Sequence, residues 1–320
     1  MGMVRMTSIE LPIAHRGILA PRSPLRMTLD RLMANRPAVL GMIGLGLFVL
    51  VCYGTLPWTI HSYNQQNLNA ALQSPSWQHW MGTDALGRDL LSRFLLGGAI
   101  SLLIGIFSAM IAVGIGLTVG LISGYVGGRL DALLMRAVDV LYGLPYILLV
   151  ILLRVSLVNR ISHYLAAIGL PQAQGLAGIM VLLLGIGGVS SLTMARVIRG
   201  QTMSLVNQPY VEAARATGAG PSRIILHHIL PNLIGSVAVY AALTVPNAIL
   251  AESFLSFLGL GVPPPIPTWG NLAASGVQAI NPIHTQWWLI TWPCVGLTLA
   301  LLSLNFLGDA LRDALDVRTR

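Results

Sequence analysis

Six stretches of about 20 residues with almost no charged side chains constrain this chain more than any other feature. A helix rises about 1.5 Å per residue, so about 20 apolar residues cross the hydrocarbon core of a bilayer. The expected spans are Ala38–Pro57, about Ile100–Ile122, about Val140–Val158, about Gly175–Thr193, the stretch from Pro231 to Phe257, and about Trp287–Leu307. The sequence therefore predicts an all-α fold, a polytopic membrane bundle of about six transmembrane helices.

The composition agrees with a membrane protein and excludes two kinds of chemistry. Only 9% of the residues are charged and 55% are hydrophobic, whereas a soluble domain carries about 25% charged residues. All 19 basic residues are arginine, so the chain lacks the lysine that a Walker A phosphate loop or a Schiff base requires. Cys52 and Cys294 lie far apart inside apolar runs, and this spacing predicts neither a disulfide framework nor a metal site.

The placement of arginine predicts how the bundle sits in the membrane. With six spans both termini lie on one side, and that side would hold 15 of the 19 arginines. The positive-inside rule therefore places both termini in the cytoplasm. The expected segments are a cytoplasmic tail over 1–36 with an interfacial helix at Pro24–Arg36, a first transmembrane helix over 37–58, an external loop over 59–95, a core membrane domain over 96–310 with a cytoplasmic loop at about 205–230, and a cytoplasmic tail over 311–320.

One charged stretch, PYVEAARATGAGPSRIILHHILPN from Pro209 onward, interrupts two apolar runs on the predicted cytoplasmic side. We expect Asn207 to cap a first helix, with Pro209 in its first turn and Glu212 near the positive end of its dipole. Gly218 is expected to end this helix in a left-handed conformation. A helix of about nine residues is shorter than the roughly 12–15 residues that are marginally stable alone in water, so it needs a surface to dock on.

The same stretch resembles the EAA loop of binding-protein-dependent ABC importer permeases. The motif spacing is matched by Glu212, Ala213, Ala214, Gly218, Leu230 and Pro231, with His228 where the family often has isoleucine. Four further stretches resemble the C-type subunit of the oligopeptide and dipeptide (peptide/nickel) permeases: MGTDALGRDLLSRFLLGGAISLLIG, GYVGGRLDALLMRAVDVLYGLP, ILAESFLSFLGLGVPPPIPTWG and NFLGDALRDALD. The resemblance covers about Pro37 to Asp316.

This resemblance implies a permease subunit of an ATP-driven importer of di- or oligopeptides in the bacterial inner membrane. It implies a second homologous permease, two ATP-binding subunits that carry ATP and Mg, an external peptide-binding protein and membrane lipid as partners, and no nucleic acid. It implies no catalytic residue, cofactor or metal in this chain. In the family the EAA loop is the coupling helix, and the residues carried over to that role are Glu212, Ala213, Ala214, Arg215, Gly218, Leu230 and Pro231.

Further polar residues are candidates for the outer face and the transport path. Asp84 and Arg88 are expected to pair on one helix face with Asp89 beside them, either as a surface that receives the binding protein or as an ordinary interfacial fold-back. Glu252 lies about 20 residues into the fifth span. With Asn247 it is a candidate for the translocation path or outer vestibule. The alternative for Glu252 is a carboxylate that snorkels or caps.

Other residues within or near the spans predict packing and anchoring. Glycines one turn apart predict a face of close helix contact, at Gly116, Gly120, Gly124 and Gly128. Arg154 is expected to snorkel outward from the third span. Four tryptophans near the last span predict an aromatic belt, namely Trp269, Trp287, Trp288 and Trp292.

Two other classes of protein are weighed against this interpretation. A secondary transporter driven by an ion gradient tends to place carboxylates near the membrane midplane, and no acid of this chain is predicted there. An intramembrane enzyme needs a nucleophile and a base close together, and the sequence offers no such pair. Within the resembled family, nickel complexes and glutathione remain alternative cargoes.

Overall fold

The computed structural model describes residues 30–55, 62–170, 173–280 and 285–315. These residues form helices and no strand. Six of the helices are long and apolar enough to cross a membrane: α2 (Arg36–Gly54), α3 (Leu90–Val126), α5 (Tyr146–Ala167), α6 (Ala173–Val206), α9 (Leu230–Phe257) and α11 (Trp288–Leu315). The shorter elements are η2 (Leu68–Ala70), α4 (Gly128–Tyr142), α7 (Pro209–Ala216), α8 (Pro221–Ile224), η3 (Ile225–Ile229) and α10 (Trp269–Gln278). The predicted all-α fold and its six spans are confirmed.

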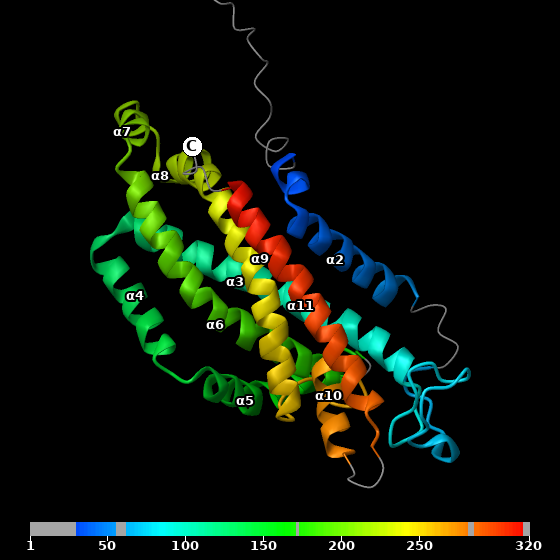
Figure 1. Ribbon diagram of the computed structural model, residues 1–320. Helices are drawn as coiled ribbons and strands as arrows, with labels where there is room; N and C mark the ends of the chain where they lie inside the picture. Colours follow the sequence, from blue (N-terminus) through cyan, green and yellow to red (C-terminus); the bar gives the residue numbers. More distant parts are fainter. Residues whose placement is uncertain (1–29, 56–61, 171–172, 281–284, 316–320) are drawn as a thin grey trace, which may run out of the picture.

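Helix α3 runs through the bundle and packs against α6 and α9 (Figure 1). A Cβ atom added at Gly116, Gly120 or Gly124 would lie 2.7 Å from an atom of α6. The backbones of α3 and α6 therefore approach more closely than any side chain would permit. Gly128 does not belong to this face, because it has a φ of +59°, meets nothing within 4 Å and begins α4 after a sharp turn. The glycine prediction is confirmed at three positions and wrong at the fourth.

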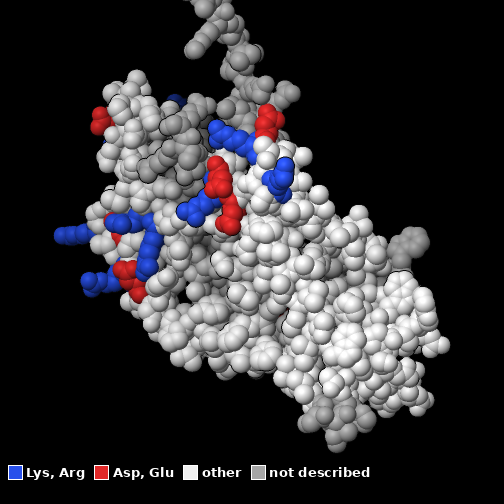
Figure 2. All heavy atoms as spheres, viewed as in Figure 1, with Lys and Arg blue, Asp and Glu red and all other residues white. Residues whose placement is uncertain are grey.

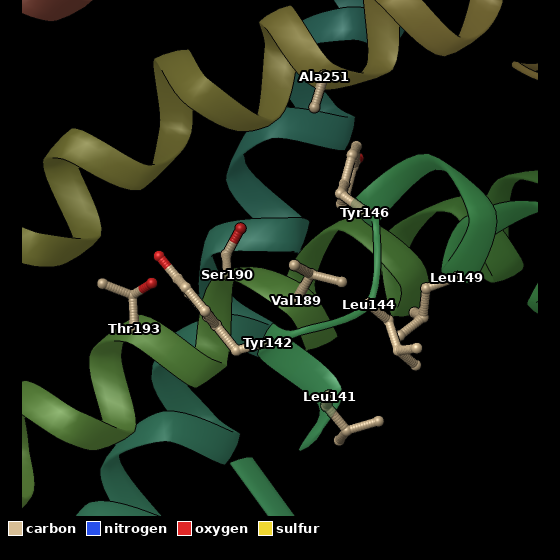
Figure 3. Close-up of a pocket in the computed structure, with 9 residues that line it drawn as sticks. All are labelled: Leu141, Tyr142, Leu144, Tyr146, Leu149, Val189, Ser190, Thr193 and Ala251. Atoms are coloured by element: carbon tan, nitrogen blue, oxygen red, sulfur yellow. The ribbon is translucent and has the colours of Figure 1, made fainter. Parts of the chain in front are cut away.

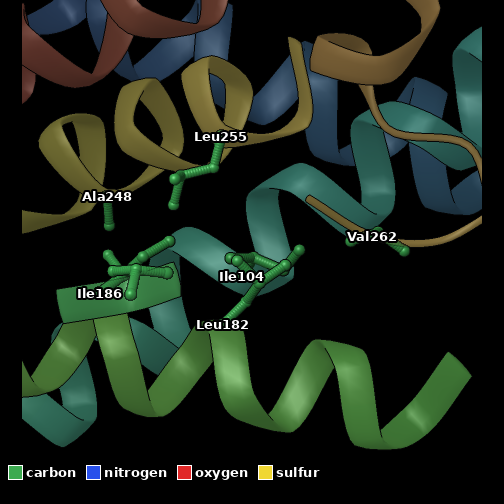
Figure 4. Packing of buried hydrophobic residues seen from close by; sticks show 7 residues of the cluster. Ile104, Leu182, Ile186, Ala248, Leu255 and Val262 are labelled. Atoms are coloured by element: carbon green, nitrogen blue, oxygen red, sulfur yellow. The ribbon is translucent and has the colours of Figure 1, made fainter. Parts of the chain in front are cut away.

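A buried apolar cluster joins the three central helices (Figure 4). Ile104 of α3 lies between Leu182 and Ile186 of α6 and Ala248 and Leu255 of α9, and all five are at most 1% exposed. Interior contacts of this kind supply dispersion attraction that lipid tails match only in part. The cluster packs α3, α6 and α9 against one another, and α6 and α9 carry the candidate site described below.

The two ends of the bundle differ in charge. At one end Leu32 packs against Ala310 and Ala314, and Arg31 Nη1 donates to the Ala314 carbonyl at 3.1 Å. The start of α2 and the end of α11 therefore lie together, and α7 lies at the same end (Figure 1). Figure 2 shows charged side chains gathered toward this end, while the lower part of that face is almost free of them. We call this end of the bundle, which holds α7, the start of α2 and the end of α11, the charged end. The charged side chains gathered there agree with the predicted excess of arginine on one side of the membrane.

The predicted N-terminal interfacial helix lies only partly within the described residues. Residues 30–34 are helical, the chain leaves the helix at Asn35, and α2 then begins at Arg36 with a proline in its first turn. Two predicted segment boundaries fall inside helices. Helix α3 begins at Leu90, within the predicted external loop, and α11 continues to Leu315, within the predicted C-terminal tail.

The predicted third span, 140–158, combines parts of two helices. Its first three residues belong to α4, and α5 runs over Tyr146–Ala167. The break lies at Gly143 and Pro145, because a proline disfavours helical geometry at the residue before it. Pro145 is the N-cap of α5.

Helix α10 forms between the fifth and sixth predicted spans, where the sequence predicts no helix. Thr268 Oγ1 accepts from the Asn271 amide and Asn271 Oδ1 accepts from the Thr268 amide, which is a capping box. Trp269 is fully buried, and its Nε1 donates to the Phe94 carbonyl at 3.1 Å. Trp269 and the buried Trp288 are therefore packing residues and not members of the predicted aromatic belt, whereas Trp287 is 50% exposed.

Candidate functional site

Helix α7 lies beyond the end of α6 at the charged end of the bundle (Figure 1). Pro209 occupies its first turn and Glu212 lies near its N-terminus, as predicted. Its N-cap residue is Gln208 and not Asn207, so that prediction is wrong. The Asn207 side chain instead donates from Nδ2 to the Met203 carbonyl at 3.0 Å, and this bond closes the last turn of α6.

One residue seats α7 on the bundle. Val211 is fully buried in a cluster with Ile198 of α6, Ile224 of α8 and residues of α9. Glu212 and Ala213 are exposed. The short helix therefore docks on its own chain through one face and presents the other face outward.

Gly218 ends α7 as the sequence predicts. It has a φ of +84°, its amide donates to the Arg215 carbonyl at 2.9 Å, and the Ala219 amide donates to the Ala214 carbonyl at 3.0 Å. This pair of bonds is a Schellman motif, which satisfies the last carbonyls of the helix. Glycine is the residue that adopts this left-handed conformation without strain.

The second half of the segment is continuous with the fifth span. Helix α8 passes into the π-helical turn η3, and η3 passes directly into α9. The Leu230 amide donates to the Ile225 carbonyl, five residues back. π-Helical turns are rare and occur frequently at functional sites. Leu230 and Pro231 therefore lie at the base of the segment, where Leu230 packs against the buried cluster, and the exposed residues of the motif lie at its tip.

A cavity of about 440 Å³ lies between the α4–α5 connection, α6 and α9 (Figure 3). The Tyr146 hydroxyl is buried there and has no hydrogen-bond partner within the described part of the chain. Four of the lining residues carry a hydroxyl group and none carries a charge: the lining comprises Leu141, Tyr142, Leu144, Tyr146, Leu149, Val189, Ser190, Thr193 and Ala251. These residues come from four helices, α4, α5, α6 and α9, and from the connection between α4 and α5, so no local sequence pattern points to them.

Glu252 does not line this cavity. Its side chain is fully buried, and it accepts hydrogen bonds from Ser256 Oγ at 2.6 Å and from Ser101 Oγ of α3 at 3.2 Å. The structure therefore corrects the expected place of Glu252 in a path or vestibule, because the carboxyl group turns inward and ties α9 to α3. Asn247 is exposed one turn before Ala251, with its Nδ2 donating to the Leu243 carbonyl at 2.9 Å, and its role in the path stays a prediction.

The predicted pair Asp84 and Arg88 forms in a turn and not on a helix. Arg88 Nε lies 2.7 Å from Asp84 Oδ2, and Asp84 Oδ1 accepts the amides of Leu86 and Arg88. Asp89 is the N-cap of α3, where it accepts from the Ser92 amide at 2.9 Å and contacts His79 Nδ1 at 2.9 Å. Asp84 and Asp89 are buried, so these carboxylates shape the loop before α3, and any contact with an external protein stays a prediction.

Arg154 also differs from its prediction. Its Nη1 donates to the carbonyl of Gly261, in the loop that follows α9. The guanidinium group therefore satisfies a backbone acceptor of the protein and does not merely reach toward the membrane surface.

Comparisons with known proteins place this architecture in a family. Residues 116–320 match the model described as binding-protein-dependent transport system inner membrane component. Residues 23–75 match the N-terminal transmembrane domain of oligopeptide transport permease C. The chain is 42% identical over 293 residues to the oligopeptide transport system permease protein OppC of Haemophilus influenzae, covering 91% of this chain and 87% of that one. It is also 42% identical over 291 residues to the dipeptide transport system permease protein DppC of Bacillus subtilis, covering 91% and 84%.

A solved structure shares the fold. The inward-facing MetNI methionine ABC transporter matches with a TM-score of 0.52 and 19% identity, over 71% of this chain and 98% of the matched one. This likeness supports the helical arrangement, and the sequence matches decide the family. The chain belongs to the binding-protein-dependent transport system inner membrane components, in the branch of the oligopeptide and dipeptide C-type permeases.

Proposed function

We propose that this chain forms part of the translocation path of an ATP-driven importer of di- and oligopeptides. Its place would be the bacterial inner membrane, with both termini cytoplasmic. Family membership supports the permease role, and the names of the relatives support peptide cargo. The observation that carries the proposal is α7, a short helix seated by Val211 at the charged end with Glu212 and Ala213 facing outward.

The exposed side of α7 suits contact with a separate ATP-binding subunit. Its alanines allow another protein to approach the helix backbone closely, and Glu212 and Arg215 offer charges for orientation. The proposed assembly holds two such subunits, which would bind ATP and Mg, a second related permease and an external peptide-binding protein. This chain would hold no cofactor of its own. Closure of the ATP-binding subunits would displace α7, and α6 and α9, which flank it, would move with it and open the path.

The cavity of Figure 3 supports a path for peptides of varied sequence. Its uncharged hydroxyl groups match the amide and carbonyl groups that every peptide backbone carries, and they select no particular side-chain charge. Selectivity would then reside in the external binding protein. Asn247 is a candidate for the same path, since it lies one helical turn from the lining residue Ala251.

Two substitutions at the tip of the segment test the proposal. Glu212→Arg reverses an exposed charge, and Gly218→Pro cannot adopt the φ of +84° observed there. Both variants are expected to insert into the membrane and to lose at least tenfold in ATP-dependent peptide uptake. Gly220→Ala is the matched control, because Gly220 has a φ of −70° and open space around it. Uptake at the wild-type rate in both variants would contradict the coupling role of α7.

A further inference from the structure

Helix α4 is fastened to the bundle with little apolar contact. Only two of its 15 residues are buried, Asp131 and Val138. Leu133 and Val140 are 67% and 64% exposed. Because burial of apolar surface is small, α4 depends on other contacts to keep its position beside α6.

The first of these contacts is a two-point ion pair. Arg199 of α6 reaches Asp131 with Nε at 2.5 Å from Oδ1 and with Nη2 at 2.6 Å from Oδ2. Ser123 of α3 donates to the same carboxylate. Two parallel bonds between a guanidinium and a carboxylate fix orientation as well as distance. Asp131 therefore joins α3, α4 and α6 at one place.

The second contact also comes from α6. Arg196 Nη2 lies 2.8 Å from Asp139 Oδ1, and the Arg196 guanidinium carbon lies 4.2 Å from the centre of the Tyr142 ring. A guanidinium over an aromatic face adds a cation–π attraction. Arg196 thus holds the last turn of α4 at two side chains, and one of them, Tyr142, lines the cavity.

The two ion pairs lie between α7 and the cavity. Arg199 is about two turns before Val206, where α6 ends, and Arg196 is about one turn farther from that end. Thr193 follows after another turn and lines the cavity. Along α6 the order is therefore α7, the first ion pair, the second ion pair and the cavity.

We infer that these pairs, Asp131–Arg199 and Asp139–Arg196, make α4 a rigid extension of α6, so that a displacement of α7 moves the cavity wall at Tyr142 and Thr193 together. We call them the α4–α6 clamp. The inference rests on the proposed function and names the contacts that transmit the displacement of α7 to the cavity wall. Their residues are positioning residues, since they act on the path through Tyr142. The Asp139–Arg196 pair is largely exposed, with side chains 65% and 38% accessible, so changes there leave the interior packing intact.

A charge-exchange cycle tests the clamp in the assembled importer. Asp139→Arg, Arg196→Asp and the double variant are reconstituted in proteoliposomes with the partner subunits. Uptake of radiolabelled trialanine and ATP hydrolysis are measured together. Each single variant is expected to hydrolyse ATP at about the wild-type rate while the ATP used per peptide rises at least fivefold. The double variant restores the opposite charges and is expected to return that ratio to within about twofold of wild type.

The control is Asp313→Arg, the same charge reversal at an exposed position of α11 near the charged end, and it is expected to leave the ratio unchanged. Single variants with a wild-type ratio would overturn the inference, as would a double variant that assembles but stays uncoupled. Co-purification of the partner subunits verifies assembly. Wild-type complexes that transport no peptide would contradict the proposed function, whereas insensitive variants in a transporting complex contradict only the clamp.

Discussion

Close packing of α3 against α6 can be tested at a single residue, Gly120, where a Cβ atom would come 2.7 Å from the Ala195 carbonyl and 2.8 Å from Ile198 Cβ. Because a backbone oxygen cannot move aside like a flexible side chain, Gly120→Ala must separate α3 from α6. Overpacking of this kind costs about 1–3 kcal/mol. We expect a lower unfolding temperature in detergent. Gly114→Ala is the matched control, since Gly114 has open space and an alanine there favours the helix. Equal unfolding temperatures for the two variants would contradict the close contact.

A second residue makes the stability of the protein depend on pH. The hydrogen bonds from Arg199 hold the pKa of Asp131 below its ordinary value. A carboxylate with a lowered pKa stabilises the folded state above the pKa of the unfolded chain, about 3.9 for Asp, and this contribution disappears as the pH falls through the folded-state pKa. Wild type should therefore unfold at a higher temperature than Asp131→Asn at pH 7, and the difference should shrink below about pH 4. Thermal unfolding monitored at several pH values measures it, and a constant difference down to pH 3 argues against the assignment.

Among the elements, α3, α9 and α10 meet at Glu252. The carboxyl group accepts from Ser101 and Ser256, and the Trp269 amide at the start of α10 donates to the same Ser101 hydroxyl at 3.3 Å. Glu252→Ala removes the acceptor for the buried hydroxyl protons of Ser101 and Ser256, at about 1–3 kcal/mol for each group. Glu252→Gln keeps one acceptor oxygen and the side-chain volume. We expect the alanine variant to lower the unfolding temperature and to speed proteolysis around α10, and the glutamine variant to do so much less. Equal effects would show that the hydrogen bonds are not what holds α10.

The same elements show which parts of the fold the sequence predicts. The spans follow from apolar length alone, so all six are recovered. Helix α4 mixes charged and apolar residues like any surface helix, and the predicted spans include only its last three residues. Helix α10 is short and follows several prolines, and what stabilises it is a capping box together with Trp269 buried against Phe94. Contacts of that kind join residues 175 positions apart, and no local pattern reports them.

At the scale of the whole molecule, the two parts of the candidate site were predictable to different degrees. The segment that begins at Pro209 is one continuous stretch, so its motif, its left-handed Gly218 and its exposed Glu212 follow from spacing along the chain. The cavity takes Tyr146, Thr193 and Ala251 from α5, α6 and α9, and its position depends on how those helices cross. Glu252 illustrates the limit, because a helical acid faces either the path or the interior according to a rotation that the sequence leaves open.

The proposed orientation of the whole bundle predicts that α7 and the loop before α3 face opposite compartments. Trp77 is 95% exposed on the loop before α3, and Thr217 is exposed at the end of α7. Single cysteines at these positions would be placed in a Cys294→Ser background, since Cys294 is exposed and Cys52 is buried. A membrane-impermeant maleimide should label Trp77→Cys in intact spheroplasts and Thr217→Cys only in inverted vesicles. Co-expression of the ATP-binding subunits should then protect Thr217→Cys and leave Trp77→Cys reactive. Labelling of Thr217→Cys from outside would invert the topology and remove the physical basis for coupling, because an ATP-driven subunit in the cytoplasm could not reach α7.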